Sequence, residues 1–324
     1  MKYVFFDIEC ACVYKNIAKI CVFGYCEADE QFNILKKEDI LINPNGKFHL
    51  TDHDGDGIVL PYDYASFSSL PDFPHFYPRI RELLEGEDVM VVGHATINDV
   101  KYLNLETRRY KLPPLTFSYV DTQILYMAMT DIYDRQAGLE TLTKELNIEY
   151  TPHRAADDAY ATLRVAQEMC RMEETTFPEL LRKYGIRLGR TQNGQFTGCG
   201  SERKTQYAAK MRKARLERSE KRSKFNDFVY GYRAKPQSTE FKGKRFSFSM
   251  AIEENLPLSK TLVKEIVRRG GKYSLRLSGC NVYVEEDSDD SARKKNAVKL
   301  KESGQISGIY TLSAFREMLG LNKE

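Results

Sequence analysis

Asp7 and Glu9 are the first residues of the chain whose types and spacing suit metal-ion chemistry. They lie two positions apart in an apolar segment, residues 2–8, whose composition is typical of a buried β-strand. Because side chains alternate along a strand, both carboxylates point to the same face. Two buried like charges are costly unless a cation neutralises them, and a divalent metal would do so. By itself, however, an Asp-x-Glu this short is more often the exposed end of a strand.

Two later segments carry groups of the same kind. Asp99 opens a predicted helix at about 97–109, directly after the apolar strand 88–93, and His153 and Asp158 stand at the start of another helix at about 155–172. Each has an ordinary alternative, because an acid in a first helical turn often compensates the helix dipole or caps the helix. A loop histidine is likewise common. Taken separately, neither segment establishes a site.

The elements that must position these groups alternate in type over the first ~185 residues. Apolar runs predict strands at 2–8, 17–25, 31–42 and 88–93, and helical segments are expected at 76–84, 97–109, 123–130, 138–147 and 155–172. In the last helix Ala159, Leu163, Ala166 and Cys170 recur at helical spacing and form one apolar face. Three consecutive strands followed by strand–helix alternation predict an α/β domain built around a mixed sheet.

The order and spacing of the motifs resemble the DnaQ-like, or DEDDh, 3′→5′ exonuclease superfamily, which includes proofreading subunits of the DNA polymerase III epsilon type. Its three motifs are matched by residues 6–9, 93–100 and 153–158, and the connecting segments 120–122 and 138–142 match as well. The resemblance covers roughly residues 1–175. It implies a ribonuclease H-like mixed sheet for a first domain at 1–186.

The same resemblance implies a mechanism. Asp7, Glu9, Asp99 and Asp158 would bind two divalent ions, Mg²⁺ or Mn²⁺, which prefer oxygen ligands and stabilise in-line displacement at phosphorus. His153 would take the proton from the attacking water. Hydrolysis from a free 3′ end would release nucleoside 5′-monophosphates.

Positions next to the metal ligands depart from the family pattern. Cys10 and Ala11 follow Glu9 where threonine is usual, and Ala95 and Asn98 replace the usual asparagine and phenylalanine of the second motif. These neighbours lie where relatives bind the terminal nucleotide, so the substrate preference stays open. The residues assigned to substrate binding are Ile8, Cys10, Ala11, His94 and Asn98.

Residues 187–240 are predicted to be a basic linker, partly helical or disordered. Glycine and polar residues dominate 189–206, and residues 201–225 hold ten Lys or Arg against three Glu. A helix over 204–221 would be polar on nearly every side. Such a segment either contacts nucleic-acid phosphates, with nearby aromatic residues stacking on bases, or is a solvated tether.

Residues 241–324 are predicted to form a second, smaller α/β domain with the element order β-α-β-β-α-β-α, and they resemble a BRCT domain. The matching features are residues 241–249, the helix that ends before Gly270-Gly271, the basic helix near 291–302 and the closing segment 309–319. Phe315 stands near the place of the family's usual tryptophan. The phosphate-binding candidates are Ser249 with Lys294 or Arg293. A protein-binding or purely structural module is the alternative.

Three functions are compatible with these features. The first is a 3′→5′ exodeoxyribonuclease of DNA repair or replication, since BRCT domains are typical of DNA-repair proteins; such a domain would also recruit a protein partner. An RNA-trimming exoribonuclease would use the same metal site. An inactive scaffold that binds nucleic-acid ends or phosphoproteins is the third, although it would not need four clustered acids.

Composition places the chain among soluble, cytoplasmic proteins. It has 324 residues, 42% hydrophobic and 29% charged, with a net charge of +3. No apolar run approaches the ~20 residues of a membrane span, and the seven scattered cysteines suggest reduced thiols rather than a zinc site. Residues 52–57 match the opening of a calcium-binding loop without its flanking helices, so a polar surface loop is expected there.

Overall fold

The computed structural model describes residues 1–49, 59–286 and 288–321. It divides into two compact units, Met1–Ala208 and Ala209–Glu324. Residues 52–57, the calcium-loop match, lie outside the described residues.

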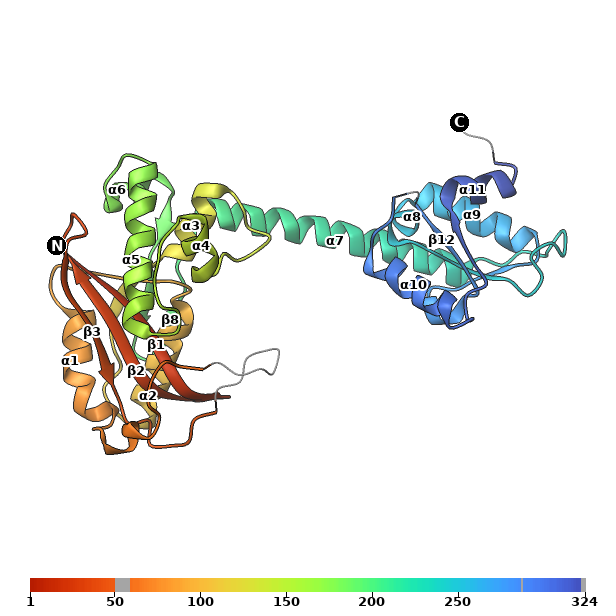
Figure 1. Ribbon diagram of the computed structural model, residues 1–324. Helices are drawn as coiled ribbons and strands as arrows, with labels where there is room; N and C mark the ends of the chain where they lie inside the picture. The colour runs from red at the N-terminus through yellow and green to blue at the C-terminus, as the bar shows by residue number, and fades with distance from the viewer. Residues whose placement is uncertain (50–58, 287, 322–324) are drawn as a thin grey trace. The chain divides into compact units, whose positions relative to one another are not determined.

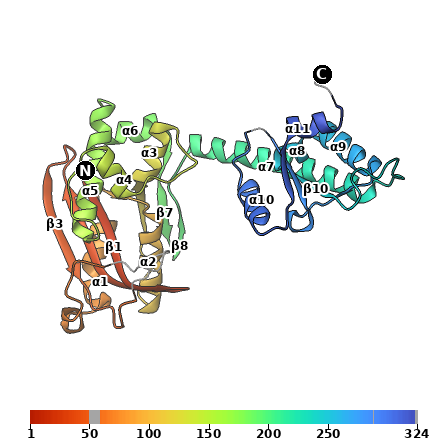
Figure 2. The same ribbon diagram turned by 45° about the vertical axis from the view of Figure 1, so that its right-hand side comes forward.

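The first unit is built on a seven-stranded sheet with the order β3-β2-β1-β4-β5-β7-β8. β1 is antiparallel to β2 and parallel to β4, β5 continues the parallel part, and β7 is antiparallel to β5. The predicted mixed α/β sheet is therefore confirmed, with β3 and β8 at opposite edges (Figure 2). The strands are β1 (Lys2–Tyr14), β2 (Ile17–Ala28), β3 (Ile34–Leu41), β4 (Val89–Gly93), β5 (Phe117–Asp121), β7 (Gly189–Gln192) and β8 (Gln195–Thr197), and β6 (Ile186–Arg187) pairs separately with β9 (Gly200–Ser201).

Alternation along β1 gives the sheet two buried faces. Tyr3 and Phe5 pack in one core with α5, which lies across this face of the sheet (Figure 1), whereas Phe6 and Ile8 pack in a second core with α1 and α2. A strand buried on both faces needs apolar residues at every position, which explains why the two acids of β1 stand out. The helices are α1 (Phe73–Glu85), α2 (Ile97–Arg109), α3 (Thr122–Thr130), α4 (Leu139–Glu145), α5 (Ala155–Met172), α6 (Phe177–Lys183) and α7 (Glu202–Gly231).

Short strands and one long helix occupy much of the segment 187–240, which was predicted to be a basic linker, partly helical or disordered. Residues 189–201 contribute strands to the first unit, and α7 runs as one uninterrupted helix through the division between the units. The polar composition of residues 189–201 gave no sign of these strands in the sequence. β7 is held by backbone hydrogen bonds to β5, which do not require an apolar pattern of side chains. Gly189 also allows the Tyr119 ring to pack against the backbone, since a Cβ there would lie 2.3 Å from that ring.

The second unit has a four-stranded parallel sheet with the order β11-β10-β12-β13. Its element order is the predicted one, apart from the added short helix α8. Phe315 is fully buried in this core, and so is Phe225 of α7, which sequence analysis had placed in the linker. The elements are β10 (Arg245–Phe248), α8 (Met250–Glu254), α9 (Leu256–Arg268), β11 (Lys272–Tyr273), β12 (Val282–Glu285), α10 (Ala292–Glu302), β13 (Gly308–Thr311) and α11 (Leu312–Met318).

All seven cysteines are unpaired, as expected for thiols. Among the described residues, no helix combines the length and the apolar character needed to cross a bilayer.

Candidate active site

Asp7 and Glu9 lie on β1 just beyond the end of its pairing with β4. That pairing runs from Lys2 to Phe5, and β4 ends at Gly93. The two acids therefore lie at the carboxyl end of the parallel strands, where the chain leaves β4 and enters α2. Irregularities in the β1–β2 ladder begin directly after Glu9, and they end the regular alternation of β1 there.

Asp158 joins these two acids from the first turn of α5. One carboxylate oxygen each from Asp7, Glu9 and Asp158 lie within 4.8 Å of one another. The Oδ2 atom of Asp158 is buried and has no hydrogen-bond partner in the structure. Buried carboxylate oxygens are normally hydrogen-bonded or bound to a cation, so this atom suits a metal ligand.

Asp99 is buried in the first turn of α2 and lines the same cleft as Asp7 and Glu9, although it is outside the tight group of three. Asp121 shapes the turn that precedes α2. Its carboxylate accepts hydrogen bonds from the backbone amides of Ala95 (3.0 Å) and Thr96 (3.1 Å), and Ala95 has a positive φ of 53°. Asp121 thus has a structural role in orienting the segment that carries Asp99.

The electrostatics of the cluster favour a bound cation. Burial, followed by repulsion from neighbouring acids, raises the pKa of Asp7 to about 7, of Glu9 to about 9 and of Asp158 to about 8. The same causes, with burial first and Asp7 second, raise the pKa of Asp99 well above its usual value. These four acids, of which Asp99 and Asp158 are buried and Asp7 and Glu9 partly buried, repel one another and form a hard oxygen donor set that fits a hard divalent cation.

His153 lies at the edge of this cluster. It has a positive φ of 63°, its side chain is 48% exposed, and its Nε2 atom lies 3.9 Å from Glu140 Oε1. Its backbone hydrogen bond to Asp158 lowers the pKa of that acid, against the larger effect of burial. The backbone of His153 is therefore next to the acids, whereas its imidazole points toward solvent and Glu140.

The cleft beside the acids has a volume of about 380 Å³. Of the residues assigned to substrate binding, Ile8, Cys10, His94 and Asn98 line it. The structure corrects the fifth: Ala11 is fully buried in a separate apolar cluster with Cys21, Val22 and Leu60. The ladder irregularities around Cys10–Cys12 account for this change of direction.

His94 is a wall residue whose ring nitrogens are both engaged. Nδ1 lies 2.9 Å from Thr122 Oγ1, and Nε2 lies 2.9 Å from the Ala137 carbonyl oxygen. Burial lowers the pKa of His94 to about 4, so the ring is neutral near pH 7.

Val13, His49 and Tyr102 also line the cleft, and none of them was among the residues predicted for the site. Tyr102 stands three residues after Asp99 on α2, so helical spacing could have found it. Burial, with smaller effects from nearby ionisable groups including Asp99, raises the pKa of Tyr102 to about 12. No comparable signal in the sequence pointed to Val13 or His49.

Gly24 sets the distance between β1 and α5. It pairs with Asp7 on one side and with Asp39 of β3 on the other. A Cβ on Gly24 would lie 2.1 Å from the backbone carbon of Ala155, so the start of α5 rests directly on this glycine. Because α5 approaches the sheet so closely at Gly24, Asp158 in its first turn lies near Asp7.

Asp39 and Tyr62 hold the same helix start by hydrogen bonds. The Asp39 carboxylate accepts from the backbone amide of Ala156 (2.7 Å) and from Arg154 Nε (3.1 Å), and the Tyr62 hydroxyl accepts from the amide of Ala155 (3.1 Å). These bonds satisfy first-turn amides that no helix can pair internally. Gly24, Asp39 and Tyr62 were not predicted from the sequence, because their roles depend on tertiary contacts.

We expect Gly24→Ala to destabilise the first unit by about 1–3 kcal/mol, because the added methyl overlaps the α5 backbone. Displacement of Asp158 by about 1 Å should lower hydrolysis by about a hundredfold. The matched control is Gly138→Ala, where nothing lies within 4 Å of the new Cβ. Thermal unfolding and a nuclease assay on both variants test this, and equal behaviour of the two would contradict the role of Gly24.

Residues 74–169 match the sequence model of a DEDDh family described as DNA polymerase III subunit epsilon-like, C-terminal domain. The matched range includes Asp99, His153 and Asp158 and amounts to less than half of the chain. This match supports a 3′→5′ exonuclease. No curated protein matches the chain.

Several solved structures are similar to the chain. One is described as "3'-end specific recognition of histone mRNA stem-loop by 3'-exonuclease", with 13% identity, a TM-score of 0.48, and coverage of 62% of this chain and 91% of that chain. E. coli exonuclease I in complex with a dT13 oligonucleotide has 19% identity, a TM-score of 0.39, and coverage of 56% and 43%. The chain thus spans less than half the length of exonuclease I.

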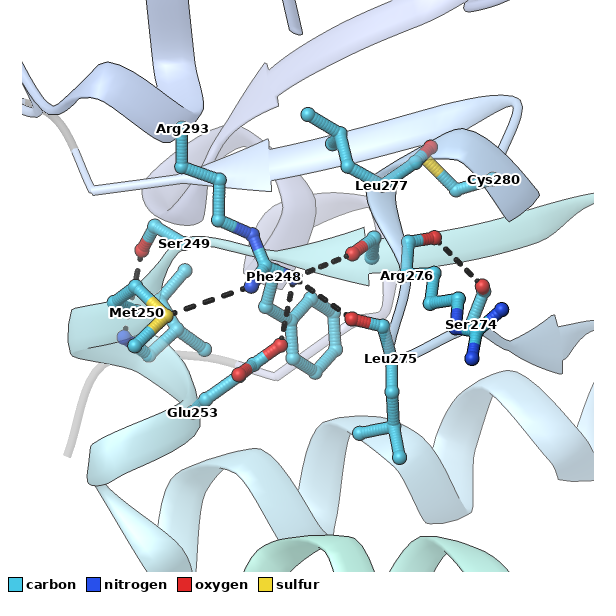
Figure 3. A network of polar contacts seen from close by, with 12 residues as sticks. Phe248, Ser249, Met250, Glu253, Ser274, Leu275, Arg276, Leu277, Cys280 and Arg293 are labelled. Carbon is cyan, nitrogen blue, oxygen red and sulfur yellow. Dashed lines mark hydrogen bonds and ion pairs between the residues drawn. The ribbon is translucent and has the colours of Figure 1, made fainter. Parts of the chain in front are cut away.

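The phosphate-binding candidates of the second unit are engaged with other partners. Ser249 is buried, and its hydroxyl accepts a hydrogen bond from the Ile252 amide at 3.4 Å, which caps α8 (Figure 3). Lys294 Nζ forms an ion pair of 2.7 Å with the buried Glu285. A phosphate would have to displace Glu285, so these contacts favour the protein-binding or structural alternative.

Arg293, the other candidate, points into the second unit. Its guanidinium donates to Glu253 Oε1 (2.9 Å) and to Ser247 Oγ (2.9 Å), and it also contacts Met250 and the Leu275 carbonyl (Figure 3). Glu253 is almost fully buried. Arg293 is therefore a structural cation, which neutralises a buried carboxylate.

We expect Glu253→Ala to destabilise the second unit by about 3–5 kcal/mol, because it leaves Arg293 partly buried without its carboxylate. Glu254→Ala is the control, since Glu254 pairs at 3.8 Å with a largely exposed Arg218 and its loss should cost under about 1 kcal/mol. Hydrogen exchange of β12 amides isolates this unit from the first. Similar protection in both variants would refute a structural role for the Arg293–Glu253 pair.

Proposed function

We propose that the protein is a metal-dependent exonuclease that hydrolyses DNA from the 3′ end and releases nucleoside 5′-monophosphates, in DNA replication or repair. The observation that carries the proposal is the convergence of Asp7, Glu9 and Asp158, with an unpartnered buried oxygen on Asp158 and with Asp99 in the same cleft. Such a cluster is unfavourable without a cation and useful with one.

Asp7, Glu9, Asp99 and Asp158 would hold two Mg²⁺ or Mn²⁺ ions. The ions supply positive charge that stabilises the oxygens at the reacting phosphorus. His153 is the candidate general base, because an imidazole can accept a proton at neutral pH and its side chain is 48% exposed beside the acids. Ile8, Cys10, Asn98 and Tyr102 would contact the terminal nucleotide.

The second unit supports DNA rather than RNA as the substrate. In its parallel sheet the first strand, β10, lies between the second, β11, and the third, β12. This strand order and the element order β-α-β-β-α-β-α support a BRCT-like domain. BRCT-like domains are typical of DNA-repair proteins and bind other proteins, so a protein partner is also proposed for this unit. We also propose a cytoplasmic location for the protein.

The test uses the full chain with DNA and RNA oligonucleotides labelled at either end, in Mg²⁺, Mn²⁺ or EDTA. We expect stepwise shortening of DNA from the 3′ end, with mononucleotide products, in either metal and none in EDTA. Faster shortening of RNA would favour the exoribonuclease. The inactive scaffold would be favoured if the wild-type protein bound DNA or RNA as the Asp158→Asn variant does, and if neither protein shortened the oligonucleotides in the presence of metal.

A further inference from the structure

A long, positively charged surface of the described chain lies on α7. Its stretch from Arg203 to Lys224, called here the α7 cation stretch, contains ten Lys or Arg and only two acids, Glu217 and Glu220. In all of α7 only Phe225 is buried. The stretch is therefore a helix whose surface is almost entirely in solvent.

Few of these cations have a carboxylate partner. Lys224 pairs with Glu220 at 2.7 Å, and Arg218 lies 3.8 Å from Glu254. Among the described residues of the α7 cation stretch, the exposed cations that form no ion pair include Lys210, Arg212, Lys213, Arg215 and Lys221. Their charge is available to an external anion.

The spacing of the cations opposes helix formation in isolation. Like charges stand three residues apart at Lys210–Lys213, Arg212–Arg215 and Arg218–Lys221, and such pairs destabilise a helix by roughly 0.2–0.5 kcal/mol each. A stiff helical tether would instead alternate acidic and basic residues four positions apart, so that they form ion pairs along the helix. Among the described residues of α7, one such ion pair is formed, between Glu220 and Lys224. The tether alternative therefore explains the charge pattern poorly.

Burial does not explain the helix either. The cations are distributed around all sides of the stretch, so no apolar face remains for packing. Met211 and Leu216 are exposed. A polyanion that neutralised these charges would remove the repulsion and stabilise the helix.

We propose that the α7 cation stretch binds the phosphate backbone of the nucleic-acid strand on which the first unit acts, without sequence preference. The inference rests on the proposed function for the identity of the polyanion. Each phosphate contact releases a condensed counterion, so affinity should fall steeply with salt, with a logarithmic slope of about −0.7 per contact for a single strand.

The experiment measures binding of a long labelled single-stranded DNA to the full chain by fluorescence anisotropy, across a range of KCl. All variants carry Asp158→Asn and are kept without divalent metal, so that the DNA stays intact. The test variant adds Lys210→Gln, Arg212→Gln, Lys213→Gln and Arg215→Gln. The control removes the same charge from exposed lysines elsewhere, with Lys242→Gln, Lys295→Gln, Lys299→Gln and Lys301→Gln.

We expect the test variant to lose at least about tenfold in affinity at low salt and to reduce the salt slope by about 3, from four contacts at ~0.7 each. The control should change by less than twofold, and the circular dichroism of both should remain helical. Equal losses in both variants, or none, would overturn the inference, as would tighter binding to vesicles containing phosphatidylserine than to DNA.

Failure of the inference is distinguishable from failure of the proposed function. The four α7 substitutions are also tested with Asp158 intact, on a dinucleotide. If the variant with the four α7 substitutions cleaves the dinucleotide at the wild-type rate and also binds long DNA as tightly as wild type, the α7 contact alone is contradicted. Loss of long-DNA binding in a chain that never cleaves any substrate contradicts the exonuclease alone.

Discussion

Asp7→Asn is expected to lower hydrolysis by at least about a thousandfold while leaving the metal-free protein as stable as wild type or more stable. The amide keeps the shape of the carboxylate but is a poor ligand for a hard divalent cation, and several kcal/mol of charge stabilisation would be lost. Stability should not fall, because Asp7 repels Glu9, Asp99 and Asp158 in the metal-free site.

The matched control is Asp39→Asn. Asp39 lies across Gly24 from Asp7 and also raises its pKa, but its carboxylate accepts hydrogen bonds from Ala156 and Arg154. Its substitution should lower stability by about 1–3 kcal/mol, the usual effect of losing hydrogen bonds to a charged group. Initial rates and thermal midpoints, both measured without and with Mg²⁺, separate the two roles. An Asp7→Asn protein that retains wild-type activity in Mg²⁺ would refute the assigned site.

The stability of the metal-free protein should fall by about 5 kcal/mol as pH rises from about 6.5 to 8.5. In the unfolded chain the acids of the cluster release their protons near pH 4, whereas the folded pKa values of Asp7, Asp158 and Glu9 are about 7, 8 and 9. The folded state therefore binds more protons throughout this window. A raised acid pKa of this kind costs stability once the unfolded chain has ionised.

Mg²⁺ should reverse this dependence, because it binds the ionised acids and so stabilises the folded state most at the upper end of the window. Below pH 6.5 His94 acts in the opposite direction: its folded pKa is lowered to about 4, so stability is lost as pH falls. Denaturant titrations at pH 6.5, 7.5 and 8.5, with EDTA or Mg²⁺, test the prediction. Asp7→Asn is the control and should show a weaker response to both pH and metal. Metal-free stability that stays constant or rises across the window would contradict the raised pKa values.

Much of the secondary structure of the first unit could be predicted from the sequence, because the local residue patterns there agree with the places of the elements in the fold. The apolar face of Ala159, Leu163 and Ala166 predicted the helix that the structure places at α5, with the same bounds. The spacing of Asp7 and Glu9 on a strand, and of Asp99 and Asp158 at helix starts, predicted the groups that line or surround one cleft. Their catalytic roles stay a prediction.

What sequence analysis missed depends on contacts between distant segments. Gly24 is an ordinary strand glycine until α5 rests on it, and β7 is too polar to read as a strand until it pairs with β5. Ala11 turns away from the cleft because of ladder irregularities that no residue type announces. The sequence also does not show that Glu285 pairs with Lys294, a phosphate-binding candidate from the BRCT resemblance.

The burial of Phe225 bears on where the second unit can be cut from the chain. Its ring lies among the core aromatics, 5.4 Å from the ring of Tyr273, and Phe228 and Tyr232 pack against the same core. A fragment beginning at residue 241 would lack Phe225 and the aromatic residues that follow it. Loss of a buried phenylalanine side chain typically lowers the free energy of unfolding by about 3–5 kcal/mol. Any recombinant piece, or any natural transfer of this module to another protein, must therefore carry the last turns of α7 with it.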